Sequence, residues 1–567
     1  MNRNVESHFA LNPTNIDIRR STFDRSHSLK TSFNVGDIVP FFIDEVLPGD
    51  TFNVDTSKVV RLQTLLTPVM DNIYLDTYYF FVPNRLTWSH WKQFNGENTE
   101  SAWIPQTEYE IPQVTAPSGT GWSVGTIADY LGVPTGISNL SVSALPFRAY
   151  ALIMNEWFRD ENLSDPLVVP VDDATVAGVN TGTFVTDVAK GGLPYKAAKY
   201  HDYFTSCLPS PQKGPDVLIP VAQAGSYPVV SLSSEVDASK SNSSLVFKAK
   251  SYSQKPYLGV NSFIDSSNLR STDFDQGNDS FASAAGSSSG VVPVNLWAVA
   301  DGNAAAATIN QLRMAFQIQK LYEKDARGGS RYIEILKSHF GVTSPDARLQ
   351  RPEYLGGNRI PININQVVQQ SATASGETAQ GTVTGMSVTT DTHSDFTKSF
   401  TEHGFVIGVM VARYDHTYQQ GLERFWSRKD RFDYYWPVFA NIGEQAVKNK
   451  EIYAQGPAKK DSAGNVIDDQ VFGYQEAWAD YRYKPSRVTG EMRSQYAQSL
   501  DVWHLADDYS ALPMLSDSWI REDKTNVDRV LAVTSDVSNQ LFADIYIKNR
   551  TTRPMPMYSI PGLIDHH

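Results

Sequence analysis

Residues 40–85, PFFIDEVLPGDTFNVDTSKVVRLQTLLTPVMDNIYLDTYYFFVPNR, indicate the fold class of this chain. Three runs rich in apolar and β-branched residues lie in or beside this stretch, at 39–46, 51–66 and 73–82, and such runs are typical of β-strands. Both alternating faces of the third run are apolar or aromatic, so we expect a strand that is buried on two sides. Leu47-Pro48-Gly49-Asp50 predicts a type II turn, because Pro presets φ and Gly tolerates positive φ.

Further elements are predicted along the rest of the chain. Apolar residues at helical spacing predict helices at 147–158, 308–326 and 330–340, with N-caps at Thr308 and Ser330 and with Gly341 ending the last helix. Strands are expected at 405–414 and 541–548. Polar residues fill 366–390, where we expect a mobile loop, and the proline-rich tail after Arg553 should run extended.

Several long stretches resemble one known family. They include VPFFIDEVLPGDTF (39–52), MDNIYLDTYYFFVPNRLTW (70–88), PFRAYALIMNEWFRDENL (146–163), TEHGFVIGVMVARYDHTYQQGL (401–422) and RPMPMYSIPGLIDHH (553–567). These stretches resemble the major capsid protein of gokushoviruses, which are small single-stranded DNA bacteriophages of the Microviridae. The resemblance implies an eight-stranded antiparallel jelly roll with long loop insertions that contain helices. It also implies a T=1 icosahedral shell made of many copies.

Composition is compatible with such a protein. The chain has 567 residues, 41% of them hydrophobic, so we expect a central core with large excursions or two domains. A single cysteine, Cys207, excludes an intrachain disulfide, and no apolar run approaches the roughly 20 residues of a membrane helix. The net charge of −13 argues against general affinity for nucleic acid, so any DNA contact must be local.

We divide the chain into four parts. They are an N-terminal arm (1–32), the first part of the jelly roll (33–215), a Ser-rich surface insertion (216–300), and a helical excursion with the remaining strands and the tail (301–567). The arm is locally basic and includes Arg19, Arg20 and Arg25. It is either a solvated arm or an inward-facing segment that contacts DNA or neighbouring subunits.

The Ser-rich insertion is the candidate for host attachment. Residues 231–290 contain 18 Ser and few large apolar side chains, so this segment cannot build a large core and belongs on a surface. By its position, this insertion resembles the gokushovirus insertion whose three copies meet as a protrusion at the threefold axes. Candidate attachment residues are Ser231, Tyr252, Tyr257, Phe263, Phe274 and Gly290.

A second candidate site is ERFWSRKDRFDYYW (423–436). Its basic residues Arg424, Arg428, Lys429 and Arg431 alternate with aromatic residues that include Trp426. Such a pattern is suited to following a phosphate backbone and stacking bases, but Asp430 and Asp433 weaken this interpretation. A subunit interface rich in aromatic residues and Arg is at least as favoured.

No catalytic motif is evident. His393, His403 and His416 lie near acidic residues, but their spacing matches no known metal motif, and solvated or hydrogen-bonded histidines are favoured. Cys207 is more typical of a small buried residue than of a nucleophile. We therefore expect no catalytic residues, no metal and no cofactor. The alternative is a phage-borne jelly-roll protein that binds or cleaves carbohydrate.

The favoured hypothesis is a non-enzymatic major capsid protein. It would associate with itself into an icosahedral shell, enclose a circular single-stranded DNA genome and assemble in the bacterial cytoplasm. Expected partners are the DNA, a small DNA-binding protein, a pilot protein, a scaffold protein and a receptor on the host cell, without membrane insertion.

Overall fold

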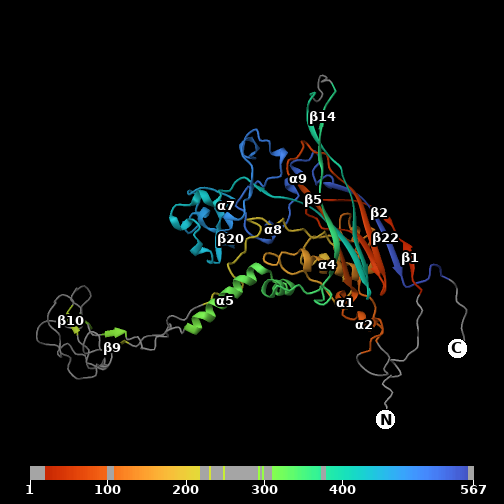
Figure 1. Ribbon diagram of the computed structural model, residues 1–567, viewed down its shortest axis with the longest axis horizontal. Coiled ribbons are helices and arrows are strands. Elements are labelled where there is room, and N and C mark those ends of the chain that lie inside the picture. The colour runs from red at the N-terminus through yellow and green to blue at the C-terminus, as the bar shows by residue number, and fades with distance from the viewer. Residues whose placement is uncertain are drawn as a thin grey trace, which may run out of the picture. The chain divides into compact units, whose positions relative to one another are not determined.

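The computed structural model describes residues 19–98, 107–217, 309–371 and 379–559, and four short strands between 229 and 298. The chain forms two compact units, Met1–Lys213 with Glu323–His567, and Gly214–Tyr322. The first unit contains two large antiparallel sheets (Figure 1). It also contains a region with a hydrophobic core of its own. No helix among the described residues is both long enough and apolar enough to cross a membrane.

The first sheet has the order β1–β22–β4–β16, and β2 also pairs with β22. Its strands are β1 (Ser21–Asp24), β2 (His27–Phe33), β4 (Thr51–Leu62), β16 (Thr389–Ser399) and β22 (Leu541–Arg553). β1 and β2 keep one register along β22, because Asp24 pairs with Arg550 and His27 pairs with Ile547. They are therefore two halves of one strand, interrupted between Asp24 and His27.

The second sheet has the order β13–β5–β17–β3. Its strands are β3 (Val39–Val46), β5 (Ile73–Pro83), β13 (Glu353–Pro361) and β17 (Gly404–Tyr414). All neighbouring pairs in both sheets are antiparallel. The prediction of a mainly β, antiparallel fold is confirmed, and every strand predicted from the sequence lies in one of these two sheets.

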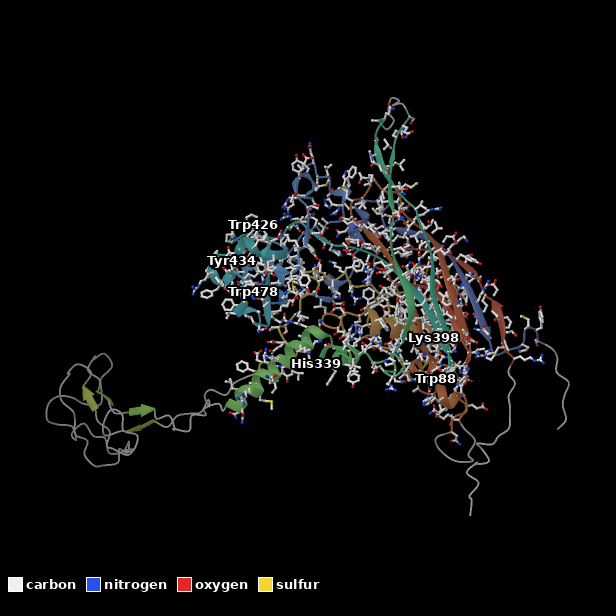
Figure 2. The ribbon with its side chains drawn as sticks, viewed as in Figure 1. Trp88, His339, Lys398, Trp426, Tyr434 and Trp478 are labelled. Atoms are coloured by element: carbon white, nitrogen blue, oxygen red, sulfur yellow. The ribbon has the colours of Figure 1, made fainter. Side chains whose placement is uncertain are left out.

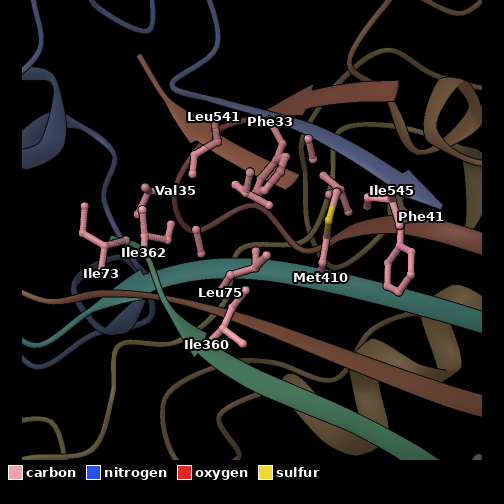
Figure 3. Packing of buried hydrophobic residues seen from close by; sticks show 14 of the residues in the cluster. Phe33, Val35, Phe41, Ile73, Leu75, Ile360, Ile362, Met410, Leu541 and Ile545 are labelled. Carbon is pink, nitrogen blue, oxygen red and sulfur yellow. The ribbon is translucent and has the colours of Figure 1, made fainter. Parts of the chain in front are cut away.

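The main hydrophobic core contains residues from both sheets. Apolar side chains of the first sheet, such as Leu541 and Ile545, lie opposite Leu75 and Met410 of the second (Figure 3). Every second residue of β4 and β22 is buried, which is the two-residue period of a strand with one covered face. Each fully buried Val, Leu, Ile or Phe side chain contributes about 1.5–3 kcal/mol to stability.

β5 is buried on both faces, as predicted. Leu75 and Phe81 point into the main core, whereas Phe80 and Val82 belong to a second core on the outer face of the sheet. This second core includes Phe147, Tyr150 and Ile153 of α4 (Leu145–Ile153), which continues as a π-helical turn at Met154–Phe158. The helix predicted at 147–158 is thus confirmed.

Smaller elements complete the outer layer. They are α1 (Asn84–Thr87), α2 (Trp91–Phe94), α3 (Ile127–Tyr130) and a three-stranded sheet of β6 (Gln113–Thr115), β7 (Ser141–Ser143) and β8 (Val176–Ala177).

The third core lies in a region that we call the side lobe, residues 415–530 with 200–208. Its elements are β18 (Thr417–Tyr418), β19 (Glu444–Lys448), α7 (Asn449–Ile452), β20 (Val471–Glu476), β21 (Ser486–Arg487), α8 (Asp517–Ile520) and α9 (Thr525–Asp528). Phe204, Tyr418, Phe472 and Trp519 are buried together here. Most of the lobe therefore has its own packing, while Leu505, Val527 and Val530 join it to the main core.

Two local predictions need correction. The loop predicted at 366–390 is wrong at both ends, because β14 (Ile364–Val368) and β15 (Val383–Ser387) pair as a ribbon and β16 follows at Thr389. The described residues between β14 and β15, 369–371 and 379–382, are in neither strand nor helix, as predicted. Most residues of β14 are exposed, so the apolar alternation that marks a half-buried strand is missing.

The predicted helix at 330–340 consists of α6 (Tyr332–Ile335) and a π-helical turn at Leu336–Phe340. Arg331, and not Ser330, is its N-cap, while Gly341 ends it with a φ of 70°, as predicted. The helix predicted at 308–326 is α5 (Ile309–Gly328).

In the unit Gly214–Tyr322, β9 (Val229–Ser231) pairs with β12 (Leu296–Ala298), and β10 (Phe247–Ala249) pairs with β11 (Val291–Pro293).

Candidate subunit and nucleic-acid interface

The candidate stretch 423–436 lies on the side lobe and is built from short turns. Two 3-10 turns, Arg424–Ser427 and Arg431–Asp433, follow each other. The Asp430 carboxylate accepts a hydrogen bond from the backbone N–H of Phe432 at 2.7 Å, and Asp433 accepts one from the N–H of Lys429 at 2.7 Å. These two acidic residues therefore hold the backbone of the loop, as capping carboxylates do.

Arg424 and Arg428 point inward, toward carboxylates of the lobe. Arg424 Nη2 lies 2.8 Å from Glu451 Oε1, and Arg428 forms an ion pair with Asp480 and stacks on Tyr481 at 4.3 Å from the ring centroid. The Arg428 side chain is only 7% exposed. Burial lowers the pKa of Arg424, but Glu451 outweighs burial and raises it above its ordinary value. Both positive charges are thus neutralised within the subunit.

Lys429, Arg431 and Trp426 face the solvent. Arg431 stacks over the ring of Phe432 at 4.8 Å, and the structure shows no carboxylate paired with the side chain of Lys429 or Arg431 among the described residues. Trp426 is 67% exposed. The structure thus brings together all five predicted residues on one loop but turns two of the four cations away from any external phosphate.

The lobe exposes a group of large aromatic side chains, which we call the aromatic surface. Its members are Phe425, Trp426, Phe432, Tyr434, Tyr435, Trp436, Tyr481 and Tyr483. Trp478, which is labelled near Trp426 and Tyr434 in Figure 2, is buried. Its ring centroid lies 5.8 Å from that of Tyr435, and its Nε1 donates to the carbonyl oxygen of Phe439 at 3.0 Å. Exposed apolar groups of this extent mark protein interaction sites.

A pocket of about 220 Å³ opens at the edge of the aromatic surface. Its walls are formed by Tyr203, Phe204, Glu423, Arg424, Phe425, Arg428, Glu451, Asp480, Tyr481, Tyr483, Lys484 and Pro485. Glu423 pairs with Lys484 and also lies 2.8 Å from Arg487. The charged groups of the pocket therefore compensate one another, and the remaining lining is aromatic apart from Pro485.

The N-terminal arm is described from Arg19 onward. Arg19 is exposed, Arg20 donates to the carbonyl oxygen of Gly49, and Arg25 pairs with Asp44. Arg25 thus joins the interruption between β1 and β2 to a strand of the second sheet. Of the three candidate residues, Arg19 is left to contact another molecule.

The candidate attachment residues fall largely outside the described residues. Ser231 ends β9, while Tyr252, Tyr257, Phe263, Phe274 and Gly290 lie outside the described part. Their role stays a prediction.

The three histidines do not converge. His393 lies 3.2 Å from Asp395, and the ring of His403 packs against Trp91. Among the described residues, no cluster of three or more His, Cys, Asp or Glu side chains is arranged to hold a metal ion. Burial raises the pKa of the Cys207 thiol, which keeps it in the protonated, unreactive form.

His416 is instead part of a buried charge network. Its Nδ1 lies 3.0 Å from Asp507 and its Nε2 lies 3.0 Å from Glu522. Burial alone would lower its pKa, but the two carboxylates outweigh burial and raise it to about 10. Neither partner could be predicted from the sequence, because both lie far along the chain and no local pattern links them to His416.

Two facing antiparallel sheets and an exposed aromatic surface define a β protein suited to lasting association with other chains. A family model described as "Capsid protein (F protein)" of phages matches residues 13–563. Capsid protein VP1 of Chlamydia phage 1 is 43% identical and covers 99% of this chain and 98% of its own length. Capsid protein VP1 of Spiroplasma virus 4 is 43% identical, with 96% of both chains covered.

Capsid protein VP1 of Bdellovibrio phage phiMH2K is 42% identical, over 99% of this chain and 98% of its own length. The chain therefore belongs to the phage F capsid protein family. The predicted resemblance to gokushovirus major capsid proteins is confirmed, and with it the prediction of a phage capsid protein.

Proposed function

We propose that this capsid protein is a non-enzymatic subunit of a T=1 icosahedral shell around a circular single-stranded DNA genome. The observation that carries this proposal is the aromatic surface, because a monomer gains nothing from exposing Trp426, Trp436 and their neighbours to water. Permanent interfaces bury roughly 2,000–5,000 Å² and are enriched in aromatic residues and Arg. Arg424 and Arg428, whose charges are neutralised internally, support a subunit contact for this stretch.

The two facing sheets are, in this proposal, the halves of an eight-stranded jelly roll. Taking β1 and β2 as one strand leaves eight strands in the two sheets. The first strand pairs with the eighth (β22), the second (β3) with the seventh (β17), the third (β4) with the sixth (β16), and the fourth (β5) with the fifth (β13). A chain folded back on itself and wrapped into two sheets gives this pairing, which supports the assignment.

We place the DNA contact on the N-terminal arm, with Arg19 as its described candidate. A net charge of −13 requires phosphate contacts to be local, and each one makes binding more sensitive to salt. The Ser-rich insertion is our candidate for contact with a host receptor. The small DNA-binding, pilot and scaffold proteins are further expected partners, with assembly in the host cytoplasm before incorporation into the virion.

Sedimentation velocity and negative-stain microscopy of the purified protein, alone and with phage partner proteins, test the proposal. We expect shells or defined subassemblies. The variant Trp426→Ser/Trp436→Ser should remain folded, with an unchanged melting temperature, but lose the larger species. Tyr332→Ser, which removes an exposed aromatic side chain from α6, is the matched control and should assemble. A wild-type protein that stays monomeric under every condition would refute the proposal.

A further inference from the structure

A proline-rich segment follows the last strand of the first sheet and is exposed. β22 ends at Arg553, which donates to the carbonyl oxygen of Glu45 at 2.7 Å and lies 3.2 Å from Asp50. Residues 554–559, PMPMYS, follow without a helix or strand, and Tyr558 is 78% exposed. Each Pro fixes its own φ and biases the preceding residue toward extended backbone, so little conformational entropy is lost when such a segment binds.

The aromatic surface has the chemistry that binds such a segment. Proline-rich segments dock in grooves lined by aromatic side chains. The segment 554–559 carries no charge, and the charges around the pocket are already paired with one another. A phosphate would meet no free cation in this pocket, whereas an uncharged apolar segment would break no ion pair.

An extended proline-rich segment makes no internal hydrogen bonds. Its carbonyl oxygens are therefore free to accept, and the Tyr558 hydroxyl is free to donate, at the mouth of the pocket.

The segment cannot come from the same subunit. Trp426 and Tyr434 lie on one side of the first unit, whereas β22 lies on the opposite side (Figures 1 and 2). We propose that the aromatic surface of one subunit binds the proline-rich tail, residues 554–559, of a second copy of this chain. The proposal rests on self-association and adds which two parts of the chain meet.

Photo-cross-linking in the full chain tests this contact. A benzophenone amino acid replaces Tyr558, and subunits grown with light and heavy nitrogen are mixed before assembly. We expect cross-links from position 558 to residues 424–436 or 479–487, joining light to heavy chains. Cross-links to other segments, or only between residues of one isotope, would overturn the proposal. Oligothymidylate should leave the cross-link yield unchanged, and protection by this probe would instead assign the surface to DNA.

A peptide assay separates this proposal from the wider one. A fluorescent peptide of residues 553–567 is titrated onto the subunit, whether or not larger species form. We expect saturable binding that weakens at least about tenfold in Trp426→Ala/Tyr481→Ala, as loss of central aromatic contacts does. It should not weaken in the control Tyr332→Ala. Binding that is absent, or insensitive to Trp426 and Tyr481, would overturn the tail contact even if shells form. Peptide binding by a protein that forms no shells would refute the proposed shell but not the tail contact.

Discussion

The burial of Arg424 and Arg428 bears on whether residues 423–436 contact DNA or another subunit, which the sequence left open. A DNA contact needs free cations, yet both guanidinium groups face carboxylates of their own subunit. Lys429 and Arg431, which alternate with the same aromatic residues in the sequence, remain at the surface. All four basic residues lie among aromatic residues in the sequence. Only the distant partners Glu451 and Asp480 distinguish the two buried cations from the two exposed ones.

We predict opposite effects for two neighbouring substitutions. Arg428→Ala leaves Asp480 buried without its cation and should destabilise the fold by about 3–5 kcal/mol, the usual cost of breaking a buried ion pair. Arg431→Ala, its matched control, removes an exposed cation and should change stability by less than about 0.5 kcal/mol. Thermal melting of both variants measures the difference. Equal melting temperatures would contradict the internal pairing.

His416 gives the protein a predictable dependence on pH. Its pKa rises from 6.5 to about 10 in the folded state, so its stabilisation is complete below about pH 6.5 and is lost as pH rises toward 10. We expect His416→Gln to melt well below the wild type at about pH 6 and the gap to narrow at about pH 10. The substitution His393→Gln, at a half-exposed site, is the control. A gap that widens with rising pH would show that His416 is neutral when folded.

At the scale of elements, the sequence predicted strands where side chains meet a core. β3, β5 and β17 were found because their apolar residues cover one or both faces. β14 and β15 were missed because backbone pairing holds them while much of the ribbon stays exposed. The partners of Arg424, Arg428 and His416 were missed for another reason. These partners lie far away in the sequence and meet their cations only in the folded chain, so local periodicity cannot predict them.

The ribbon offers a test at this scale. Val368 pairs with Val383, so replacing residues 369–382 by Asn-Gly closes β14 and β15 with a two-residue hairpin turn. Thr384 Oγ1 donates to the carbonyl oxygen of Leu65 at 2.8 Å and anchors the retained base of the ribbon. We expect the melting temperature to stay within a few degrees of the wild type, since none of the described residues in the removed segment, 369–371 and 379–382, belongs to a hydrophobic core. Global unfolding of the variant would show that the ribbon supports the sheets.

At the scale of the whole molecule, capsid function requires several roles from a single chain. The two sheets enclose a hydrophobic core, and the four short strands described between 229 and 298 belong to neither sheet. We propose the aromatic surface and the tail for contacts between copies. Because these parts share few residues, we expect that substitutions can abolish one proposed role without unfolding the two sheets. The matching experiments can therefore assign roles one at a time.

The insertion provides the last prediction. Ser231 at the end of β9 pairs with Leu296 at the start of β12, so a short Gly-Ser linker in place of residues 232–295 joins two strand ends that are already adjacent. Closing a shorter loop costs little, because loop entropy changes only by about 0.6 kcal/mol per twofold change in length. We expect the variant to fold and to form particles of normal size, as measured by sedimentation and microscopy, but to lose binding to host cells. A linker of the same length inserted after Ser231 in the intact chain is the control and should keep attachment. If the shortened variant fails to fold, the insertion supports the core, and if it binds cells normally, the receptor contact lies on another part of the chain.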